Sequence, residues 1–176
     1  MHSTDCGIRG DLKRGLPGVR RLLRRSGAVT LEMALTLSIL FSICYGLIEF
    51  GYYFYVKNTM EGAAREGCRA GIVTGATIAT ANGVIENQLQ VANLVPAGTT
   101  ASGSGTYTIG NYTVTYTDST TGTTLTSLPG SMSVGDTLTV TITATWGTVG
   151  AGFRPEALIG SSKVLTTASS MRKEGL

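Results

Sequence analysis

The chain of 176 residues is poor in the residue types on which most catalytic and metal sites depend. It has a single histidine, His2, three cysteines, and charged side chains at only 14% of its positions. Histidine is the usual general base near neutral pH and a common metal ligand, so the sequence after His2 cannot form a His-based triad or a His metal site. Cys44 and Cys68 lack the spacing of metal ligands.

The other residue types also point away from catalysis. The carboxylates beyond residue 60 are scattered, with no evident pair for acid–base work or calcium binding. The segment "GSGTYTIG" contains glycines but lacks the lysine and the strand-to-helix setting of a phosphate loop. Serine and threonine are abundant without a base to activate them. We therefore expect no enzyme, no cofactor and no metal.

The charge is distributed unevenly along the chain. Residues 1–27 hold seven basic and two acidic residues, a net charge of +5, whereas the remaining residues carry a net charge of −2. A basic block before an apolar run is typical of the cytoplasmic end of a membrane protein. Nucleic-acid binding is the alternative, but the block adjoins the apolar run and lacks interleaved aromatics. Its helix-breaking residues predict a leader without a stable fold: Gly7, Gly10, Gly15, Pro17 and Gly18.

The apolar run covers residues 28–56, in which Glu32 and Glu49 are the only charges. A helix needs about 20 apolar residues to cross a bilayer, so this run is long enough. Glu49 follows Ala28 by 21 residues, about 32 Å along a helix, and we expect its carboxylate to reach water at the far face. The aromatic residues 52–55 resemble an interfacial belt. A secretory signal peptide is the alternative, but its apolar region is shorter, roughly 7–15 residues.

Glu32 lies only one helical turn into the apolar run. An ionisable group inside a membrane helix is costly, which makes Glu32 a functional candidate; the alternative is a tolerated charge near the inner interface. The junction between Gly27 and Ala28 suggests a partner. If a peptidase cuts there, the new amine of Ala28 begins the mature chain and Glu32 becomes its fifth residue, one turn away.

This arrangement resembles the type IV prepilin signal. More narrowly, residues 46–71, "GLIEFGYYFYVKNTMEGAAREGCRAG", are similar to the TadE-like pilus-assembly proteins of the tight-adherence system. That family carries an Ile/Val-Glu-Phe-Gly segment and an Ala-Ala-Arg-Glu-Gly-x-Arg segment. The matching residues are Glu49, Phe50, Gly51, Ala64, Arg65, Glu66, Gly67 and Arg69. Cys68 departs from the pattern, because a small alanine is commoner there. We expect it to be buried in a helix packing face; the alternative is an intermolecular disulfide.

The resemblance implies a minor pilin or pseudopilin-like subunit for assembly of a tight-adherence pilus or a related secretion apparatus. It implies four kinds of partner: a prepilin-type peptidase, other pilin or pseudopilin subunits, the pilus assembly platform and the lipid bilayer. It also implies that Glu32 pairs with the Ala28 ammonium of an adjacent subunit. The implied location is the cytoplasmic membrane, crossed once, with the N-terminus in the cytoplasm and the head outside. The alternative function is a single-pass membrane-anchored binding or adhesin module that displays a threonine-rich head.

Beyond the membrane run, the pattern predicts two helical stretches. The first helix should continue to Ala70, with an ion pair between Glu61 and Arg65 and a weakening, or bend, at its glycines. Apolar residues at a 3.6-residue period then predict a second helix over residues 77–94, ended by Pro96 and Gly98.

A small antiparallel sheet should cover the apolar stripe of the second helix. Alternation predicts strands over residues 112–117 and 137–146, with a tight turn or bulge at Gly110–Asn111 and a last strand near 163–171. Residues 99–105 and 118–124 should be loops, and a mobile connection should follow residue 146 with one helical turn at 156–159. The fold class is therefore α+β and pilin-like. We expect a leader (1–27), a transmembrane and assembly helix (28–56) and an extracytoplasmic α+β head (57–176).

Overall fold

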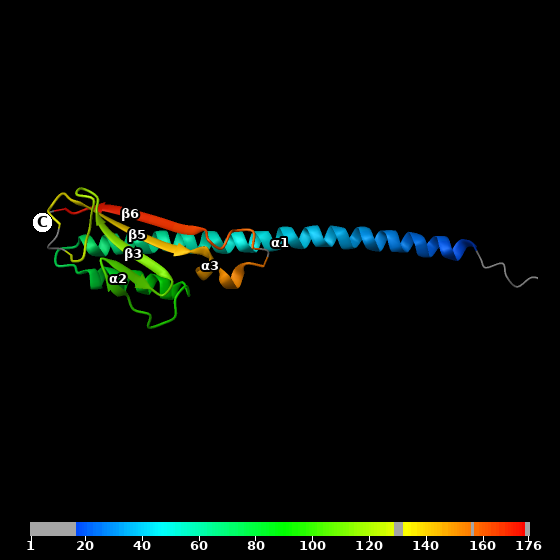
Figure 1. The fold of residues 1–176 in the computed structure, drawn as a ribbon, viewed down its shortest axis with the longest axis horizontal. Coiled ribbons are helices and arrows are strands. Elements are labelled where there is room, and N and C mark those ends of the chain that lie inside the picture. The colour runs from blue at the N-terminus through cyan, green and yellow to red at the C-terminus, as the bar shows by residue number, and fades with distance from the viewer. Residues whose placement is uncertain (1–16, 129–131, 156, 175–176) are drawn as a thin grey trace, which may run out of the picture. The chain divides into compact units, whose positions relative to one another are not determined.

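The computed structural model describes residues 17–128, 132–155 and 157–174, with side chains described from Gly27 onward. It divides into two compact units, residues 1–43 and residues 44–176. Helix α1 (Pro17–Ile72) is continuous over 56 residues, so it begins in the first unit and ends in the second. The second unit adds helix α2 (Ile78–Val91) and a six-stranded sheet (Figure 1).

The prediction that the leader has no stable fold was wrong for residues 17–27. Residues 17–27 belong to α1, and Pro17, expected to oppose structure, is the first residue of the helix. Proline suits this position because its fixed φ is helical and its missing N–H would have had no partner in the first turn. The first sixteen residues, including Gly7, Gly10 and Gly15, lie outside the described part of the chain.

Some glycines of α1 serve packing in the second unit, and none of those beyond Pro17 interrupts the helix. A Cβ placed on Gly67 would lie 2.6 Å from Cδ1 of Ile85 in α2, so a larger residue there would force the Ile85 side chain to move. Gly62 faces open space. The helix ends at Ile72, two residues beyond the expected end, and the Glu61–Arg65 ion pair is present.

Helix α2 confirms the second predicted helix but ends earlier. The side chain of Thr77 accepts a hydrogen bond from the Thr80 N–H at 3.2 Å and caps the N-terminus. At the other end Asn93 adopts a positive φ of 59°. The Leu94 N–H then bonds the Leu89 carbonyl at 2.9 Å, which closes a Schellman-type cap before Pro96 is reached.

The sheet is antiparallel throughout, with strand order β1-β2-β3-β5-β6, and β4 pairs with β3 beyond the end of β2. A two-residue turn at Gly110–Asn111 joins β2 to β3, which resolves the expected turn or bulge in favour of the turn. Two short strands lie where loops were expected, β1 and β4. The bounds are β1 Ser102–Ser104, β2 Thr106–Ile109, β3 Tyr112–Asp118, β4 Thr123–Thr124, β5 Thr137–Thr145 and β6 Val164–Arg172.

Both helices cover the same face of the sheet. Gly71 of α1 packs against Leu138 of β5, and Asn82 of α2 contacts Tyr116 of β3. The alternation predicted for β5 is confirmed: every second side chain is buried and the threonines between them are partly exposed. The buried set is Leu138, Val140, Ile142 and Ala144. The resulting core lies between one sheet face and two helices.

The connection from β5 to β6 is more ordered than predicted. Trp146, expected to end the strand, begins the short helix α3 (Trp146–Val149) and is fully buried. A 3-10 turn, η1 (Ala151–Phe153), follows. Helical turns therefore precede the expected position, residues 157–159 are irregular, and Glu156 lies outside the described residues. This connection runs beside α1 (Figure 1).

Candidate assembly site

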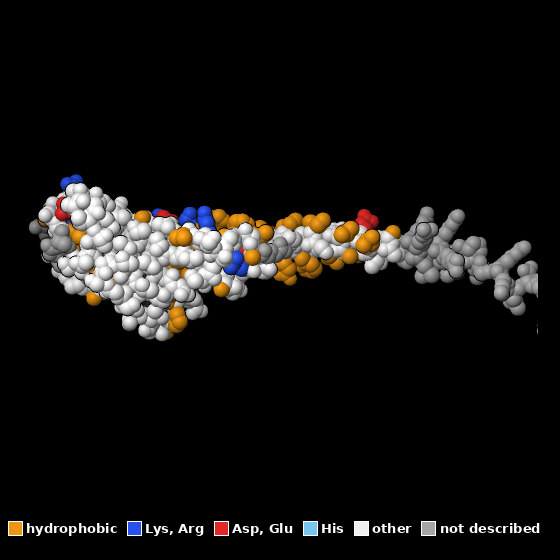
Figure 2. Space-filling model, in the orientation of Figure 1, with side chains coloured by type: hydrophobic (Ala, Val, Ile, Leu, Met, Phe, Trp, Pro, Cys, Tyr) orange, Lys and Arg blue, Asp and Glu red, His pale blue; other side chains and the backbone are white. Residues whose placement is uncertain are grey.

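The first part of α1 presents apolar side chains on all sides. From Gly27 to Ile43 every described side chain is exposed, including Val29, Leu31 and Phe41. Figure 2 shows hydrophobic side chains gathered along this stretch. Helix Gly27–Ile72 is the one helix in the described residues that is long and apolar enough to cross a membrane, by length and composition. A helix that is apolar all round requires lipid or other protein around it.

The predicted processing and assembly residues lie on this stretch. Gly27 and Ala28 are consecutive residues inside α1, and Glu32 follows one turn later with its side chain exposed. The Thr36 hydroxyl donates to the backbone carbonyl of Glu32 at 2.9 Å. Within the described residues, the Glu32 carboxylate has no ion pair. Its pairing with an Ala28 amine, and the cut that creates this amine, stay predictions.

Glu49 is the main correction to the sequence-based account, which expected its carboxylate to reach water. The Glu49 side chain is 0% exposed. Its Oε2 accepts the backbone N–H of Leu158 at 3.1 Å, and its Oε1 accepts the backbone N–H of Ile159 at 3.0 Å. A buried carboxylate is tolerated when it is hydrogen-bonded in this way. These two hydrogen bonds, called the Glu49 clamp below, hold the β5–β6 connection against α1.

No sequence pattern pointed to this clamp. The two donors are backbone groups, so the identity of residues 158 and 159 carries no signal for them. They also follow Glu49 by 109 and 110 positions in the chain. The one usable clue was the cost of placing a carboxylate in an apolar run, which calls for a compensating group.

Aromatic rings pack together just C-terminal to Glu49 in α1. Tyr52 stacks on Phe153 with ring centroids 4.2 Å apart, and Tyr53 meets Trp146 edge-on at 5.2 Å. Tyr55 remains exposed and donates its hydroxyl to the Ala92 carbonyl at 2.8 Å. Part of the expected aromatic belt is therefore used in packing α1 against the connection and α2.

The second family motif divides between two faces of α1. Ala64, Gly67 and Cys68 are buried against the sheet and α2, whereas Arg65, Glu66 and Arg69 are exposed. In the first motif, Phe50 and Gly51 are exposed. The inward members are small because α1 lies close to its neighbours, and the outward members are charged.

Cys68 is buried, as expected. Its Sγ donates to the backbone carbonyl of Ser169 in β6 at 2.9 Å. Burial raises the pKa of the Cys68 thiol, which keeps it protonated and unreactive near neutral pH.

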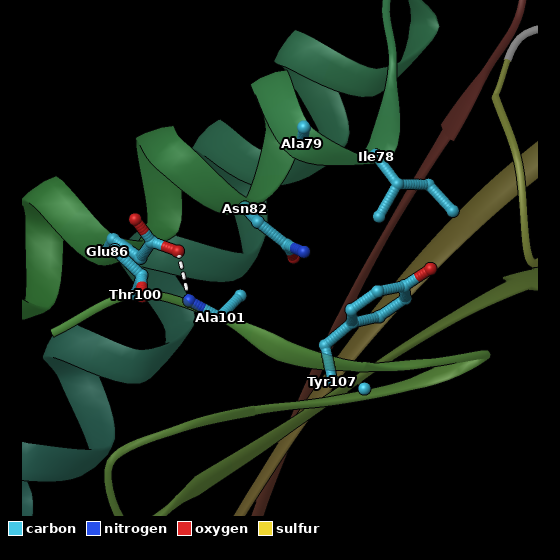
Figure 3. A pocket seen from close by; sticks show the side chains of 8 residues that line it. Ile78, Ala79, Asn82, Glu86, Thr100, Ala101 and Tyr107 are labelled. Atoms are coloured by element: carbon cyan, nitrogen blue, oxygen red, sulfur yellow. Dashed lines mark hydrogen bonds between the residues drawn. The ribbon is translucent and has the colours of Figure 1, made fainter.

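A small open cleft of about 370 Å³ lies between α2 and the first strands (Figure 3). Figure 3 shows the Glu86 carboxylate accepting a hydrogen bond from the Ala101 backbone N–H, with the Asn82 amide directed toward the space near Tyr107. Asn82 is buried in the apolar stripe of α2, and its Oδ1 accepts a hydrogen bond from the Tyr116 hydroxyl at 2.6 Å. Burial raises the pKa of that phenol, so it stays a donor. Asn82 and Glu86, two polar side chains that line the cleft, are thus already hydrogen-bonded within the chain.

The architecture defines a class of protein: a long apolar N-terminal helix followed by a shorter helix and a small antiparallel sheet, an α+β pilin-like fold. Residues 27–69 match the model of the TadE-like protein family, which confirms the resemblance drawn from the two motifs. The match covers about a quarter of the chain. No curated protein and no solved structure matches the chain. The family match and the apolar helix indicate a membrane protein associated with a tight-adherence pilus.

Proposed function

We propose that the chain is a minor pilin or pseudopilin-like structural subunit that assembles with a tight-adherence pilus or a related secretion apparatus. The observation that carries this proposal is the exposed apolar surface of α1 over residues 27–43, inside the segment that matches the TadE-like family. In a lone subunit this surface faces lipid. In an assembly, the same surface of neighbouring subunits replaces lipid.

The two acidic residues of the apolar run have different tasks in this proposal. Glu49 is already hydrogen-bonded within its own subunit by two backbone N–H groups. Glu32 has no such partner among the described residues and so remains available to another subunit. After a cut between Gly27 and Ala28 by a prepilin-type peptidase, the Ala28 ammonium of one subunit would pair with the Glu32 carboxylate of the next.

Such a pair would fix the axial offset between neighbouring helices. An amine at a helix terminus can meet a carboxylate on another helix at only one relative position, and in an apolar environment an unpaired charge is costly. Every other offset leaves two uncompensated charges. The ion pair would therefore select the register of assembly, while the apolar side chains supply the contact area.

The test is the substitution Glu32→Gln in the native host. The variant should insert into the membrane and be processed, because glutamine preserves the shape and removes the charge, yet pilus assembly should fail or slow strongly. Glu61→Gln is the matched control, since it removes a partly exposed negative charge from the same helix, outside the apolar run and outside the two family motifs. A Glu32→Gln variant that is processed, stable and fully piliated would favour the membrane-anchored binding module instead.

A further inference from the structure

The β5–β6 connection places a small surface beside α1 at the level of Glu49. This loop surface consists of Phe153, Arg154 and Leu158. The Leu158 Cδ1 packs over Gly46, where an added Cβ would lie 3.1 Å away, so the loop reaches about 4.5 Å along α1 beyond Glu49 toward the N-terminus. Phe153 stacks on Tyr52, and the Glu49 clamp holds the backbone at Leu158 and Ile159.

Two side chains of this loop surface point outward although they are large and apolar. Phe153 is 49% exposed and Leu158 is 54% exposed. At the same level of α1, Leu47, Ile48 and Phe50 are also exposed. Together they surround the helix on several sides, which differs from the single stripe by which one helix packs on another.

Basic side chains reach the surface at this level. In the described parts of residues 44–60 and 146–163 they are Lys57, Arg154 and Lys163; Glu49 is enclosed, and the acidic Glu156 lies outside the described residues. The Arg154 guanidinium donates one N–H to the Ile159 carbonyl at 3.3 Å, and its buried Nε has no hydrogen-bond partner among the described residues. Lys163 lies beside Trp146, whose backbone N–H bonds the Lys163 carbonyl.

We infer that the loop surface is a second membrane contact, which lies in the headgroup region of the leaflet on the head's side. Phe153 and Leu158 enter the upper acyl layer, and Arg154 binds lipid phosphate. Aromatic and basic side chains of this kind are favoured at membrane–water interfaces, and basic groups near the surface attract anionic lipids. The inference rests on the proposed membrane anchor.

The Glu49 clamp explains how the loop can enter this region. Irregular backbone in contact with hydrocarbon is unfavourable because its N–H and C=O groups lack partners. Two N–H groups of the loop are satisfied by Glu49, and the Ile159 carbonyl is satisfied by Arg154. The headgroup layer supplies partners for the remainder. The clamp would thereby set the depth of the head relative to the bilayer.

Site-directed spin labelling of the full chain tests this inference. Labels are placed singly at Leu158→Cys, Phe153→Cys, Leu40→Cys and Val134→Cys, in a background carrying Cys6→Ala, Cys44→Ala and Cys68→Ala. The protein is reconstituted at low protein-to-lipid ratio in vesicles of phosphatidylcholine and phosphatidylglycerol. Collision with oxygen reports the acyl region, and collision with a water-soluble nickel chelate reports water.

The labels at residues 158 and 153 should favour oxygen over the nickel chelate, between the values for residue 40 in the acyl core and residue 134 in water. Adding Arg154→Gln, or omitting phosphatidylglycerol, should shift the label at residue 158 toward water. The inference is overturned if residue 158 is as accessible to nickel as residue 134 while residue 40 stays shielded. If residue 40 is also accessible, the membrane anchor itself fails. Shielding of residue 158 that appears only at high protein-to-lipid ratio would assign the loop surface to a second copy of the chain.

Discussion

Glu49 shows how one side chain in the apolar run can be explained entirely by groups within its own chain. Substituting Glu49→Gln replaces one carboxylate oxygen by an NH₂ group, so one of the two amides, Leu158 N–H or Ile159 N–H, loses its acceptor. Leaving a buried N–H unpaired costs about 1–3 kcal/mol. The connection should therefore open more often while the sheet stays folded.

Hydrogen–deuterium exchange of the full chain in detergent measures this opening, because the Leu158 and Ile159 amides are the groups that Glu49 protects. Amide exchange in peptides that cover these two residues should be several-fold faster in Glu49→Gln than in the unsubstituted chain. Glu66→Gln, an exposed change on the same helix, should leave the exchange rate unchanged. Equal exchange in all three proteins would mean that the two hydrogen bonds do not hold the loop.

Asp118 provides a pH-dependent prediction at the same scale. Its Oδ2 accepts the Thr121 hydroxyl at 2.7 Å and its Oδ1 accepts the Thr120 N–H at 2.8 Å. These hydrogen bonds hold the pKa of the Asp118 carboxyl below its usual range. Because the folded pKa is depressed, the stabilisation is fully present above the unfolded value of about 3.9 and is lost as the pH falls through the folded pKa.

Chemical denaturation at neutral pH and near pH 3 checks the sign. The unsubstituted head should lose more unfolding free energy on acidification than Asp118→Asn, which has no charge to lose. Thr121→Val removes the hydroxyl donor, so it should raise the Asp118 pKa. The acid-induced loss of unfolding free energy should then be closer to that of Asp118→Asn. Identical acid sensitivity in all three proteins would show that Asp118 makes no pH-dependent contribution to stability.

At the scale of elements, the packing of α1 on α2 depends on glycine at one position. A Cβ at Gly67 would lie 2.6 Å from Ile85 Cδ1 and 2.8 Å from its Cγ1, whereas a Cβ at Gly62 would meet nothing within 4 Å. Gly67→Ala should destabilise the head by about 1–3 kcal/mol through overpacking. Gly62→Ala should be neutral or stabilise by up to about 1 kcal/mol, because alanine is the better helix former.

Thermal unfolding of the two variants in the same detergent provides a matched comparison on one helix. A lower midpoint for Gly67→Ala and an equal or higher midpoint for Gly62→Ala are expected. Equal losses in both variants would show that helix flexibility, rather than contact with α2, accounts for the glycines.

The elements that the sequence predicted well are those whose periodicity is undisturbed. The alternation of β5 and the apolar stripe of α2 identified both elements, and the end of α2 was misplaced because Asn93 adopts the left-handed conformation before Pro96 is reached. The strands β1 and β4 were missed since they are two or three residues long and consist of serine, glycine and threonine. Their pairing is imposed by neighbouring strands and leaves no periodic signal.

Candidate site residues could be proposed from the sequence only where their side chains lie near one another in the chain. The junction at Gly27–Ala28, Glu32 and the two motifs could be read directly, and residues 27–69 match the family. The Glu49 clamp and the buried pair of Asn82 and Tyr116 join positions that are distant in the chain. Asn82 also occupies a position at which the helical pattern alone indicates an apolar contact.

At the scale of the whole molecule, the account makes α1 both a membrane anchor and an assembly helix. The N-terminal part has an apolar surface that the described residues do not cover, and the C-terminal part packs on one side against the head through small residues and the Glu49 clamp. A simple anchor requires the first property alone. A pilin-like subunit also requires a free amine at Ala28, which only processing creates.

The mass of the mature N-terminus therefore tests the central claim most directly. The protein is isolated from membranes of its native host, and its N-terminal peptide is identified by mass spectrometry, with a Gly27→Leu variant as the control that blocks the cut. The account predicts a chain that begins at Ala28, and a full-length, membrane-bound precursor for Gly27→Leu. A full-length unsubstituted protein, or the same mature species from both, would contradict it.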